Sequence, residues 1–410
     1  MRIIIYGINY SPELTGIGKY TGEMGAWLAN QGHTVSVITA IPYYPEWQVH
    51  EKYKGKLWHK EYIEGVKVYR CPLYVPKKVS SIKRIIHELS FLFSAFPIWF
   101  STLFQKKYDA VICIAPPFHL ALLPLLYSKI RNAKLVSHIQ DLQVDAAKEL
   151  GMIKNNFFLN GMFKAEKFIL KHSSIVSTIS PGMLKKIVKK GINSLKIVLF
   201  PNWVDEHAIK PLIKSQSLRK EFGLKEDDKV VLYSGSLGEK QGLENIVKAA
   251  VHFSARKDVY FIFVGSGGGK EKLESAAREA NLTNVMFFPL QVYEKLSALL
   301  ATADIHLVLQ KKSVSDLVMP SKLINIMATG GCPIVTAPKG STLFDIVSKH
   351  NVGILVEPED VEQLKQGIEK ALETDLQVYR KNARQYAEKF LSKASILKSW
   401  ENYLQLTPNL

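Results

Sequence analysis

Cysteine is scarce in this chain of 410 residues. Its three cysteines, Cys71, Cys113 and Cys332, are far apart and lie in or beside apolar segments. A disulfide framework needs paired cysteines, and a zinc site needs closely spaced cysteine and histidine ligands. The sequence therefore excludes a disulfide scaffold, predicts no metal site, and favours buried thiols in a reducing compartment.

The common catalytic signatures are also missing. The chain has no H-E-x-x-H zinc motif, no G-x-S-x-G nucleophile elbow and no G-x-x-x-x-G-K-[ST] phosphate loop. A reaction that mainly needs its leaving group stabilised, such as departure of a nucleoside diphosphate, depends on positive charge and positioning more than on a nucleophile. These absences favour that class of reaction.

No apolar run reaches the length of about 20 residues that a membrane-spanning helix needs. The most apolar stretch is 89–104, which contains Pro97, and lysines and an arginine flank it on both sides. Such a segment is typical of an interfacial helix on an anionic membrane, although a core helix with basic ends has the same pattern. The expected membrane-facing residues are Phe91, Phe93, Phe96, Trp99, Phe100, Lys83, Arg84, Lys106 and Lys107.

Acidic residues are outnumbered, and the net charge is +17. Residues 1–205 hold 27 Lys and Arg against 13 Asp and Glu, whereas residues 206–410 hold 27 against 24. A basic first half indicates an anionic partner, and no nucleic-acid-binding module is recognisable.

Because Met1 leads directly into a strand, no signal peptide is expected. We expect a cytoplasmic protein attached peripherally to the inner face of the cytoplasmic membrane.

The hydrophobic pattern predicts an α/β protein with two domains. Arg2–Tyr6 and Thr34–Thr39 read as strands around a helix near 18–29, which is a βαβ unit of a parallel sheet. Further strands are predicted at 66–69, 109–114, 134–139, 174–179 and 197–200, then at 229–233, 259–264, 285–288, 304–309, 333–336 and 352–356. Two doubly wound, Rossmann-like domains, 1–205 and 206–375, would face each other across a ligand-binding cleft. Helices over 376–410 could pack back on the first domain.

Candidate ligand-binding residues follow the predicted strands of the first half. Gly16 and Gly18 lie in the loop after the first strand, where backbone amides could approach a ligand. His138 and Asp141 come at the end of the strand 134–139, so they could contact a sugar hydroxyl. A single histidine is as often structural.

Two segments of the second half could bind a phosphate. The loop after strand 229–233 contains Gly235, Ser236 and Lys240, and Lys240 could neutralise a leaving diphosphate. Pro320 suits a helix start, after which Ser321, Lys322 and Asn325 share one face and could hold a phosphate and then a sugar hydroxyl. An ordinary strand–helix–strand unit with a solvated lysine would give the same pattern.

Taken together, these motifs resemble the family-4 glycosyltransferases over nearly the whole chain. The matching stretches, in the family's order, are Pro12-Glu-Leu-Thr-Gly-Ile-Gly18, Gly32-His-Thr-Val-Ser-Val-Ile-Thr39, His138, Pro201-Asn-Trp-Val-Asp205, 235–242 and 320–333. The resemblance implies a GT-B fold and retaining, metal-independent sugar transfer from a nucleotide-sugar, with no cofactor. It places the donor mostly on the second domain and the acceptor on the first.

The resemblance also implies roles for particular residues. Gly16 and Gly18 would face the donor diphosphate and sugar, His138 would contact the transferred sugar, and Lys240 and Lys322 would stabilise the diphosphate. The resemblance further implies a GDP-linked donor in preference to a UDP-linked one, with fucose as the sugar. The acceptor would be a lipid-linked saccharide of surface polysaccharide biosynthesis.

The chain departs from the family pattern at several positions. Ser236 stands where an arginine is common, Lys240 comes one position early, and Asn325 replaces the later of two glutamates. The earlier glutamate has no clear counterpart, and Asp316 is a candidate substitute. These departures leave two alternatives open: a non-catalytic nucleotide-sugar-binding protein, and a nucleotide-sugar epimerase of similar architecture.

Overall fold

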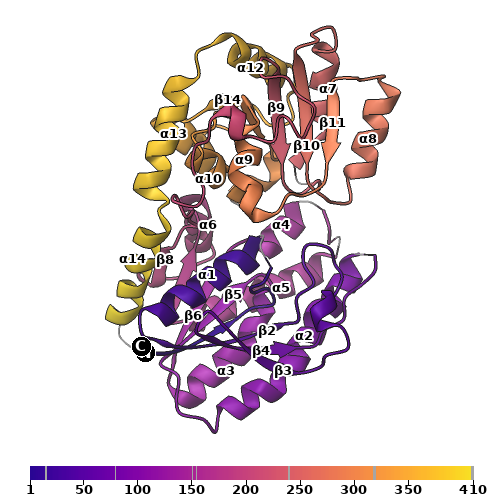
Figure 1. The fold of residues 1–410 in the computed structure, drawn as a ribbon. Helices are drawn as coiled ribbons and strands as arrows, with labels where there is room; N and C mark the ends of the chain where they lie inside the picture. The colour runs from indigo at the N-terminus through magenta and orange to yellow at the C-terminus, as the bar shows by residue number, and fades with distance from the viewer. Residues whose placement is uncertain are drawn as a thin grey trace. The chain divides into compact units, whose positions relative to one another are not determined.

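The computed structural model describes residues 1–13, 16–78, 80–149, 151–153, 155–238, 241–316 and 320–407. These residues form two compact units, one made of 1–201 and 397–410, the other of 202–396, and Figure 1 traces the chain through both. The division lies close to the predicted boundary after residue 205. The predicted segment 376–410 is not a separate unit, because helix α13 belongs to the second unit and most of helix α14 belongs to the first.

The first unit is built on an eight-stranded sheet in the order β3-β4-β2-β1-β5-β6-β7-β8. Its strands are β1 (Arg2–Tyr6), β2 (Thr34–Ala40), β3 (His59–Ile63), β4 (Val66–Cys71), β5 (Ala110–Ala115), β6 (Lys134–Ile139), β7 (Ile175–Thr178) and β8 (Ile197–Leu199). Strand β3 pairs antiparallel with β4, whereas the other neighbours pair parallel. The sequence pattern did not predict β3, because this edge strand is half-exposed and mostly polar.

Helices cover both faces of this sheet. They are α1 (Gly16–Asn30), α2 (Ser81–Thr102), α3 (Leu122–Arg131), α4 (Gln143–Glu149), α5 (Asn156–His172), α6 (Pro181–Lys189) and α14 (Lys393–Leu406). Helices α2, α3 and α5 contribute apolar side chains to one core with β1, β5 and β6. On α14, Glu401 contacts His33, and the Leu404 carbonyl accepts from the Lys134 ammonium. The C-terminal helix therefore packs on the first unit, as predicted.

Helix α2 differs from the prediction that Pro97 interrupts the apolar segment. The helix runs through Pro97 over 22 residues. Proline removes one helical hydrogen bond and displaces neighbouring carbonyls. Here the Ser94 carbonyl accepts from the Trp58 indole at 2.7 Å, which helps to satisfy the backbone around Pro97. Among the described residues, α2 is the one helix whose length and composition would allow it to cross a membrane, a test that soluble core helices also pass.

The second unit is built on a six-stranded parallel sheet in the order β11-β10-β9-β12-β13-β14. The strands are β9 (Lys229–Ser234), β10 (Val259–Val264), β11 (Val285–Phe288), β12 (Ile305–Val308), β13 (Pro333–Thr336) and β14 (Ile354–Val356). The helices are α7 (Glu244–His252), α8 (Lys270–Glu279), α9 (Leu296–Ala301), α10 (Ser321–Ala328), α11 (Thr342–His350), α12 (Val361–Glu373) and α13 (Gln377–Phe390). The predicted α/β architecture with two doubly wound sheets is confirmed.

Both faces of the second sheet are apolar, as expected for a parallel sheet between two helical layers. Helices α7, α8 and α12 pack on one face, and α10, α11 and α13 pack on the other.

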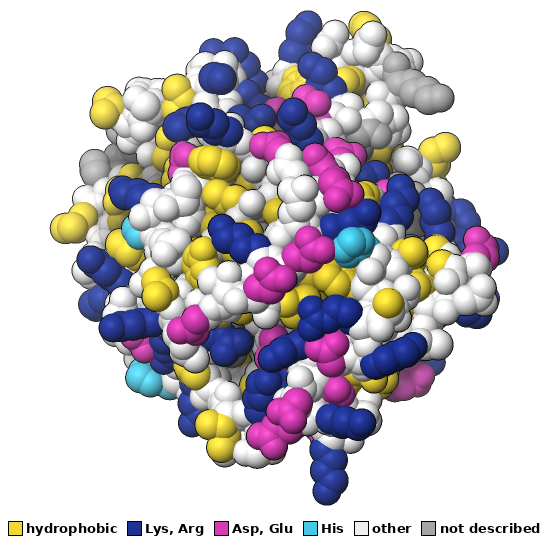
Figure 2. All heavy atoms as spheres, turned by 90° about the horizontal axis from the view of Figure 1, so that it is seen from above, with side chains coloured by type: hydrophobic (Ala, Val, Ile, Leu, Met, Phe, Trp, Pro, Cys, Tyr) yellow, Lys and Arg dark blue, Asp and Glu magenta, His cyan; other side chains and the backbone are white. Residues whose placement is uncertain are grey.

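The charge on the surface is mixed on the face that Figure 2 shows, where basic and acidic side chains alternate without a large area of one sign. This face is not a surface typical of nucleic-acid binding.

A buried ion-pair network ties the start of the second unit to its sheet. The Asp304 carboxylate accepts from the Arg219 guanidinium at 2.7 Å, the Lys214 ammonium at 2.9 Å and the Val230 amide at 2.9 Å. Burial favours the neutral acid, but these donors hold the pKa of Asp304 below its usual value. The ionised carboxylate therefore stabilises the folded state.

We predict that Asp304→Asn lowers the free energy of unfolding at pH 7 by on the order of 3 kcal/mol, because it leaves buried cations without their counter-charge. The contribution of the carboxylate is fully present above its unfolded-state pKa of about 3.9 and is lost as the pH falls through the lower folded-state pKa. Urea denaturation should therefore show a large difference at pH 7 that shrinks as the pH falls below about 3.9. Asp227→Asn, at an exposed acid nearby, is the control and should change little.

Candidate functional site

Lys322 is the most unusual charged residue of the second unit. It lies in the first turn of α10, and its ammonium is buried without a hydrogen-bond acceptor among the described residues, although the residue as a whole is partly exposed. The ammonium lies 3.5 Å from the centroid of the Tyr233 ring. Burial lowers the pKa of Lys322 to about 7. A cation of this kind is available to an anionic ligand.

Gly235 lies directly beside this ammonium. It follows strand β9 with a φ of +129°, and a Cβ added there would lie 3.2 Å from the Lys322 ammonium. Any larger residue would therefore be strained and would crowd the cation. The glycine keeps the backbone close to Lys322 at the carboxyl end of the sheet, where ligands of this fold class bind.

A second glycine-rich segment supports the first. The Leu237 amide donates to the Ser266 carbonyl at 2.9 Å, and the Gly269 amide donates to the Leu237 carbonyl at 2.8 Å. A Cβ at Gly267 would collide with the backbone of Leu237. The segment 265–269, for which the sequence indicated only a tight turn, therefore positions the loop that faces Lys322.

The other predicted donor-binding residues of this unit have different surroundings. Ser321 begins α10, and the side-chain oxygen of Asn325, one turn further on, is buried without a donor among the described residues. The Ser236 carbonyl accepts from the Tyr233 hydroxyl at 2.8 Å. The Asp316 carboxylate accepts from the Thr342 amide at 2.9 Å. Because this bond ties Asp316 to the start of α11, its predicted role as a sugar ligand gains no support.

Gly16 and Gly18 open helix α1 in the first unit. Gly16 has a φ of +58°, and a Cβ at Gly18 would lie 2.8 Å from the Cβ of Glu13. The Glu13 carboxylate is buried and accepts from the amides of Tyr43 and Tyr44 at 3.1 and 3.0 Å. Burial raises the pKa of Glu13. Glu13 therefore ties the loop after β1 to the loop after β2, and Gly18 leaves room for it.

His138 is buried inside the first unit, and both of its ring nitrogens have hydrogen-bond partners there, so its contact with a sugar stays a prediction. Its side chain is 2% exposed, and its Nδ1 and Nε2 lie 2.9 Å from the Ser177 hydroxyl and the Gln140 amide nitrogen. Burial lowers the pKa of His138 to about 3. The direction of the His138 side chain follows from the alternation of side chains along β6. His138 points toward Phe200, whereas Ser137 and Ile139 face the opposite side.

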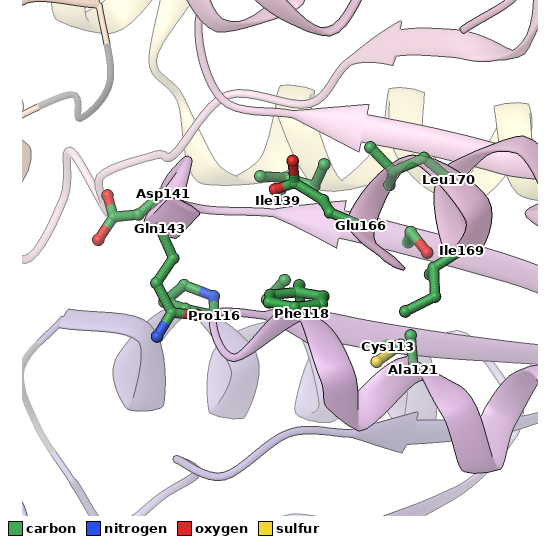
Figure 3. A pocket seen from close by; sticks show the side chains of 12 residues that line it. Cys113, Pro116, Phe118, Ala121, Ile139, Asp141, Gln143, Glu166, Ile169 and Leu170 are labelled. Atoms are coloured by element: carbon green, nitrogen blue, oxygen red, sulfur yellow. The ribbon is translucent and has the colours of Figure 1, made fainter. Parts of the chain in front are cut away.

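Asp141 lines a small cavity on that opposite side of β6. Figure 3 shows Asp141 and Gln143 at one end of the cavity and Cys113, Ala121 and Ile169 at the other. Glu166 reaches the cavity from α5 and pairs with Lys190, which also pairs with Asp145. The cavity has a volume of about 20 Å³, which is room for one group the size of a water molecule.

Comparison with known proteins identifies the family. Residues 15–203 match the family described as glycosyl transferase 4-like domain, and residues 214–390 match glycosyl transferases group 1. A protein named as the colanic acid biosynthesis glycosyl transferase WcaI of Escherichia coli strain K12 is 43% identical over 98% of this chain and 99% of its own. The chain belongs to the family-4 glycosyltransferases.

Solved structures agree on the fold. Sucrose-phosphate synthase of Thermosynechococcus elongatus has a TM-score of 0.78 at 19% identity and covers 99% of this chain and 98% of its own. WaaG, a glycosyltransferase of lipopolysaccharide biosynthesis, has a TM-score of 0.70 at 17% identity and covers 98% of this chain and 100% of its own. Anabaena Alr3699/HepE, solved with UDP and glucose, has a TM-score of 0.74 at 15% identity, with 99% and 100% covered. The GT-B fold is thereby confirmed.

Some polar residues of this glycosyltransferase were not predicted from sequence. Glu13 was visible in the matching stretch 12–18, but its burial depends on residues 43 and 44, far along the chain. Glu166 and Gln143 come together only through the packing of α4 and α5.

Lys240, predicted to stabilise the diphosphate, lies outside the described residues. Within the described ranges, no group of three or more His, Cys, Asp or Glu side chains could hold a metal ion.

We predict that His138 of this glycosyltransferase stays neutral from pH 5 to 8, because burial without a counter-charge disfavours the imidazolium. With the Gln140 amide donating to Nε2, the proton lies on Nδ1 and is donated to Ser177. Two-dimensional ¹⁵N NMR of histidine-labelled protein should show constant ring shifts for His138 over this range. A midpoint near 6.5 for His138 would contradict this environment.

Proposed function

We propose that this glycosyltransferase moves a sugar from a nucleotide-sugar to a saccharide acceptor in surface polysaccharide biosynthesis. The observation that carries this proposal is the buried ammonium of Lys322, which has no acceptor among the described residues and lies beside Gly235 at the carboxyl end of the second sheet. An anionic diphosphate would supply the missing counter-charge. The relationship to WcaI, which is named for colanic acid biosynthesis, supports the polysaccharide part.

The proposed reaction breaks the bond between the anomeric carbon and the diphosphate oxygen, and forms a bond from that carbon to an acceptor hydroxyl oxygen. Retention of configuration puts the new bond on the face that the diphosphate leaves, and the departing phosphate takes the acceptor proton. Negative charge grows on the leaving diphosphate, so a fixed cation accelerates the step. Lys322 supplies that cation and makes a metal-independent transfer chemically reasonable, while Lys240 stays a prediction from sequence.

We assign the acceptor to the first unit. Asp141, Gln143 and Glu166 line one cavity there of about 20 Å³, which has room for a single sugar hydroxyl while the rest of the acceptor stays outside. As donor we propose a GDP-linked sugar, with fucose as the sugar. HepE was solved with UDP and glucose, so a test must compare both nucleotides.

The test begins with isothermal titration of GDP, UDP, GDP-fucose and UDP-glucose, followed by turnover with a saccharide acceptor. We expect Lys322→Met to reduce turnover by on the order of 100-fold, because one preorganised charge at a leaving group contributes that much. Lys248→Met, at an exposed lysine of α7, is the matched control. Binding of a nucleotide-sugar without any transfer or hydrolysis would favour the non-catalytic alternative.

The lowered pKa of Lys322 gives this prediction a pH signature. In the free protein the ammonium loses its proton near pH 7, so diphosphate binding at higher pH requires uptake of a proton. Affinity for the nucleoside diphosphate should therefore fall as the pH rises from 7 to 9. Lys322→Arg should remove this dependence, because arginine stays protonated. An unchanged pH dependence in Lys322→Arg would contradict the role of Lys322.

Helix α2 supports attachment of the protein to a membrane. One of its faces is buried and holds two of the predicted membrane residues, Phe91 and Trp99, in the core with Tyr6. The opposite face exposes Phe93, Phe96 and Phe100, with 72%, 51% and 53% of each residue accessible. The complete exposed stripe follows helical spacing and consists of Ile82, Ile85, Ile86, Leu89, Phe93, Phe96 and Phe100.

We propose that this stripe lies on an anionic membrane, with Lys83, Arg84, Lys106 and Lys107 near the lipid phosphates. A helix with one face in a protein core fits peripheral attachment at the inner face of the cytoplasmic membrane and access to a lipid-linked acceptor. Neighbouring α3 adds Leu122, Leu126 and Ile130, which are also exposed and helically spaced.

We predict that Phe93→Ser with Phe100→Ser reduces flotation with anionic liposomes at least tenfold, because each buried aromatic ring contributes more than about 1.4 kcal/mol. Val378→Ser, at an exposed apolar residue of α13, is the control. Replacing Lys83, Arg84, Lys106 and Lys107 by glutamine should weaken binding to anionic vesicles only. Equal flotation of all variants would exclude α2 as the membrane-binding element.

A further inference from the structure

Gln310 is a buried carboxamide without hydrogen-bond partners. Only 5% of the residue is exposed, and neither its side-chain oxygen nor its nitrogen has a partner among the described residues. Its backbone is fixed, because the Gln310 amide donates to the Thr336 hydroxyl at 2.8 Å and its carbonyl accepts from the same hydroxyl at 3.0 Å. Buried polar groups are nearly always satisfied, so this carboxamide calls for a ligand or a bound water.

Gln310 lies just beyond the end of β12 and lines a cavity of about 10 Å³. The Gln241 side chain lines the same cavity, and its oxygen is likewise buried without a partner among the described residues. The remaining lining residues are Gly242, Asn245, Leu309, Thr336, Glu359, Asp360 and Leu364. The cavity therefore lies at the carboxyl end of the sheet, with two unsatisfied carboxamides in its wall.

The described side chains around this cavity do not favour a phosphate. Among the described residues, its lining contains two carboxylates, Glu359 and Asp360, and no lysine, arginine or histidine. Both carboxylates are already engaged, since Glu359 accepts from the Lys312 amide at 3.1 Å and Asp360 accepts from the Gln363 amide at 2.9 Å. A neutral group that can both donate and accept a hydrogen bond is the complement of the two carboxamides.

We infer that this carboxamide pocket, lined by Gln310 and Gln241, receives one hydroxyl group of the sugar carried by the donor. Its volume admits a group about the size of a water molecule, so a hydroxyl enters while the sugar ring stays outside. A hydroxyl can accept a hydrogen bond from the Gln310 nitrogen and donate its one hydrogen to a carboxamide oxygen, of Gln310 or of Gln241. Gln310 is thus a specificity-determining residue rather than a catalytic one.

This inference rests on the proposed function and deepens it by separating two parts of the donor. The diphosphate goes to the cation Lys322, and the sugar hydroxyl goes to the carboxamide pocket, which has no cation among its described residues, at the same sheet edge. A site built to bond a hydroxyl rejects an analogue without it, because the buried polar groups are then left unpaired. The separation can be tested by comparing ligands with and without the sugar.

The first experiment measures the affinity of Gln310→Leu for GDP and GDP-fucose, and for UDP and UDP-glucose, by isothermal titration. We expect the nucleoside diphosphate to bind within twofold of wild type and the nucleotide-sugar to bind at least tenfold more weakly. Gln366→Leu, at an exposed glutamine of α12, is the matched control. Equal weakening of both ligands, or no weakening, would overturn the inference and would favour a structural water in the pocket.

The second experiment uses nucleotide-sugars that each lack one ring hydroxyl. One of them should bind wild type at least tenfold more weakly, and Gln310→Leu should not discriminate against that same analogue. Discrimination by Gln310→Leu equal to that of wild type would contradict the pocket. If Gln310→Leu does not fold, Gln241→Leu tests the same pocket at a partly exposed residue. Failure of wild type to bind any nucleotide-sugar would overturn the proposed function itself, whereas binding that both leucine variants leave unchanged would overturn this inference alone.

Discussion

The second unit is organised around the cost of burying an ammonium. Lys322 has no acceptor among the described residues, and the Tyr233 ring compensates only part of the lost hydration. A buried ammonium of this kind requires that the surrounding backbone lies close to it. Because Gly235 has no side chain, its backbone can lie close to Lys322. Gly265 and Gly267 let a neighbouring loop pack against the backbone of Gly235 and Leu237. The same burial that destabilises the free protein strengthens the interaction with a diphosphate, because the cation gives up little water when the ligand arrives.

Much of the fold could be predicted because parallel strands buried on both faces read as continuous apolar runs. Strands β6, β10, β11 and β13 have the predicted bounds. Strand β3 escaped prediction because this edge strand, His-Lys-Glu-Tyr-Ile, begins with three polar residues and does not alternate polar with apolar residues. The helix start beside Pro320 was also predictable, since proline suits a first helical turn, whereas α1 begins at Gly16, two residues before its predicted start.

The direction of a polar side chain at a strand end could not be predicted. His138 follows four buried residues of β6, and nothing in the local sequence says which face of the sheet it joins. A shift by one residue would have turned it to the cavity beside Asp141. Helix α2 poses the same problem, because the sequence of an apolar segment does not show which of its residues will pack in the core. Phe91 and Trp99 went to the core, while Phe93 and Phe100 stayed outside.

Asn325 now has a physical explanation. It lies three residues after Lys322 on α10, a spacing that puts two side chains on the same helical face. A glutamate at this place, as is usual in the family, would offer the lysine an internal counter-charge and raise its pKa. That pair would compete with a diphosphate for the same ammonium. Asparagine can still bond a hydroxyl but leaves the cation uncompensated. The site therefore combines a buried ammonium that has no acceptor among the described residues with neutral carboxamides at Asn325, Gln310 and Gln241.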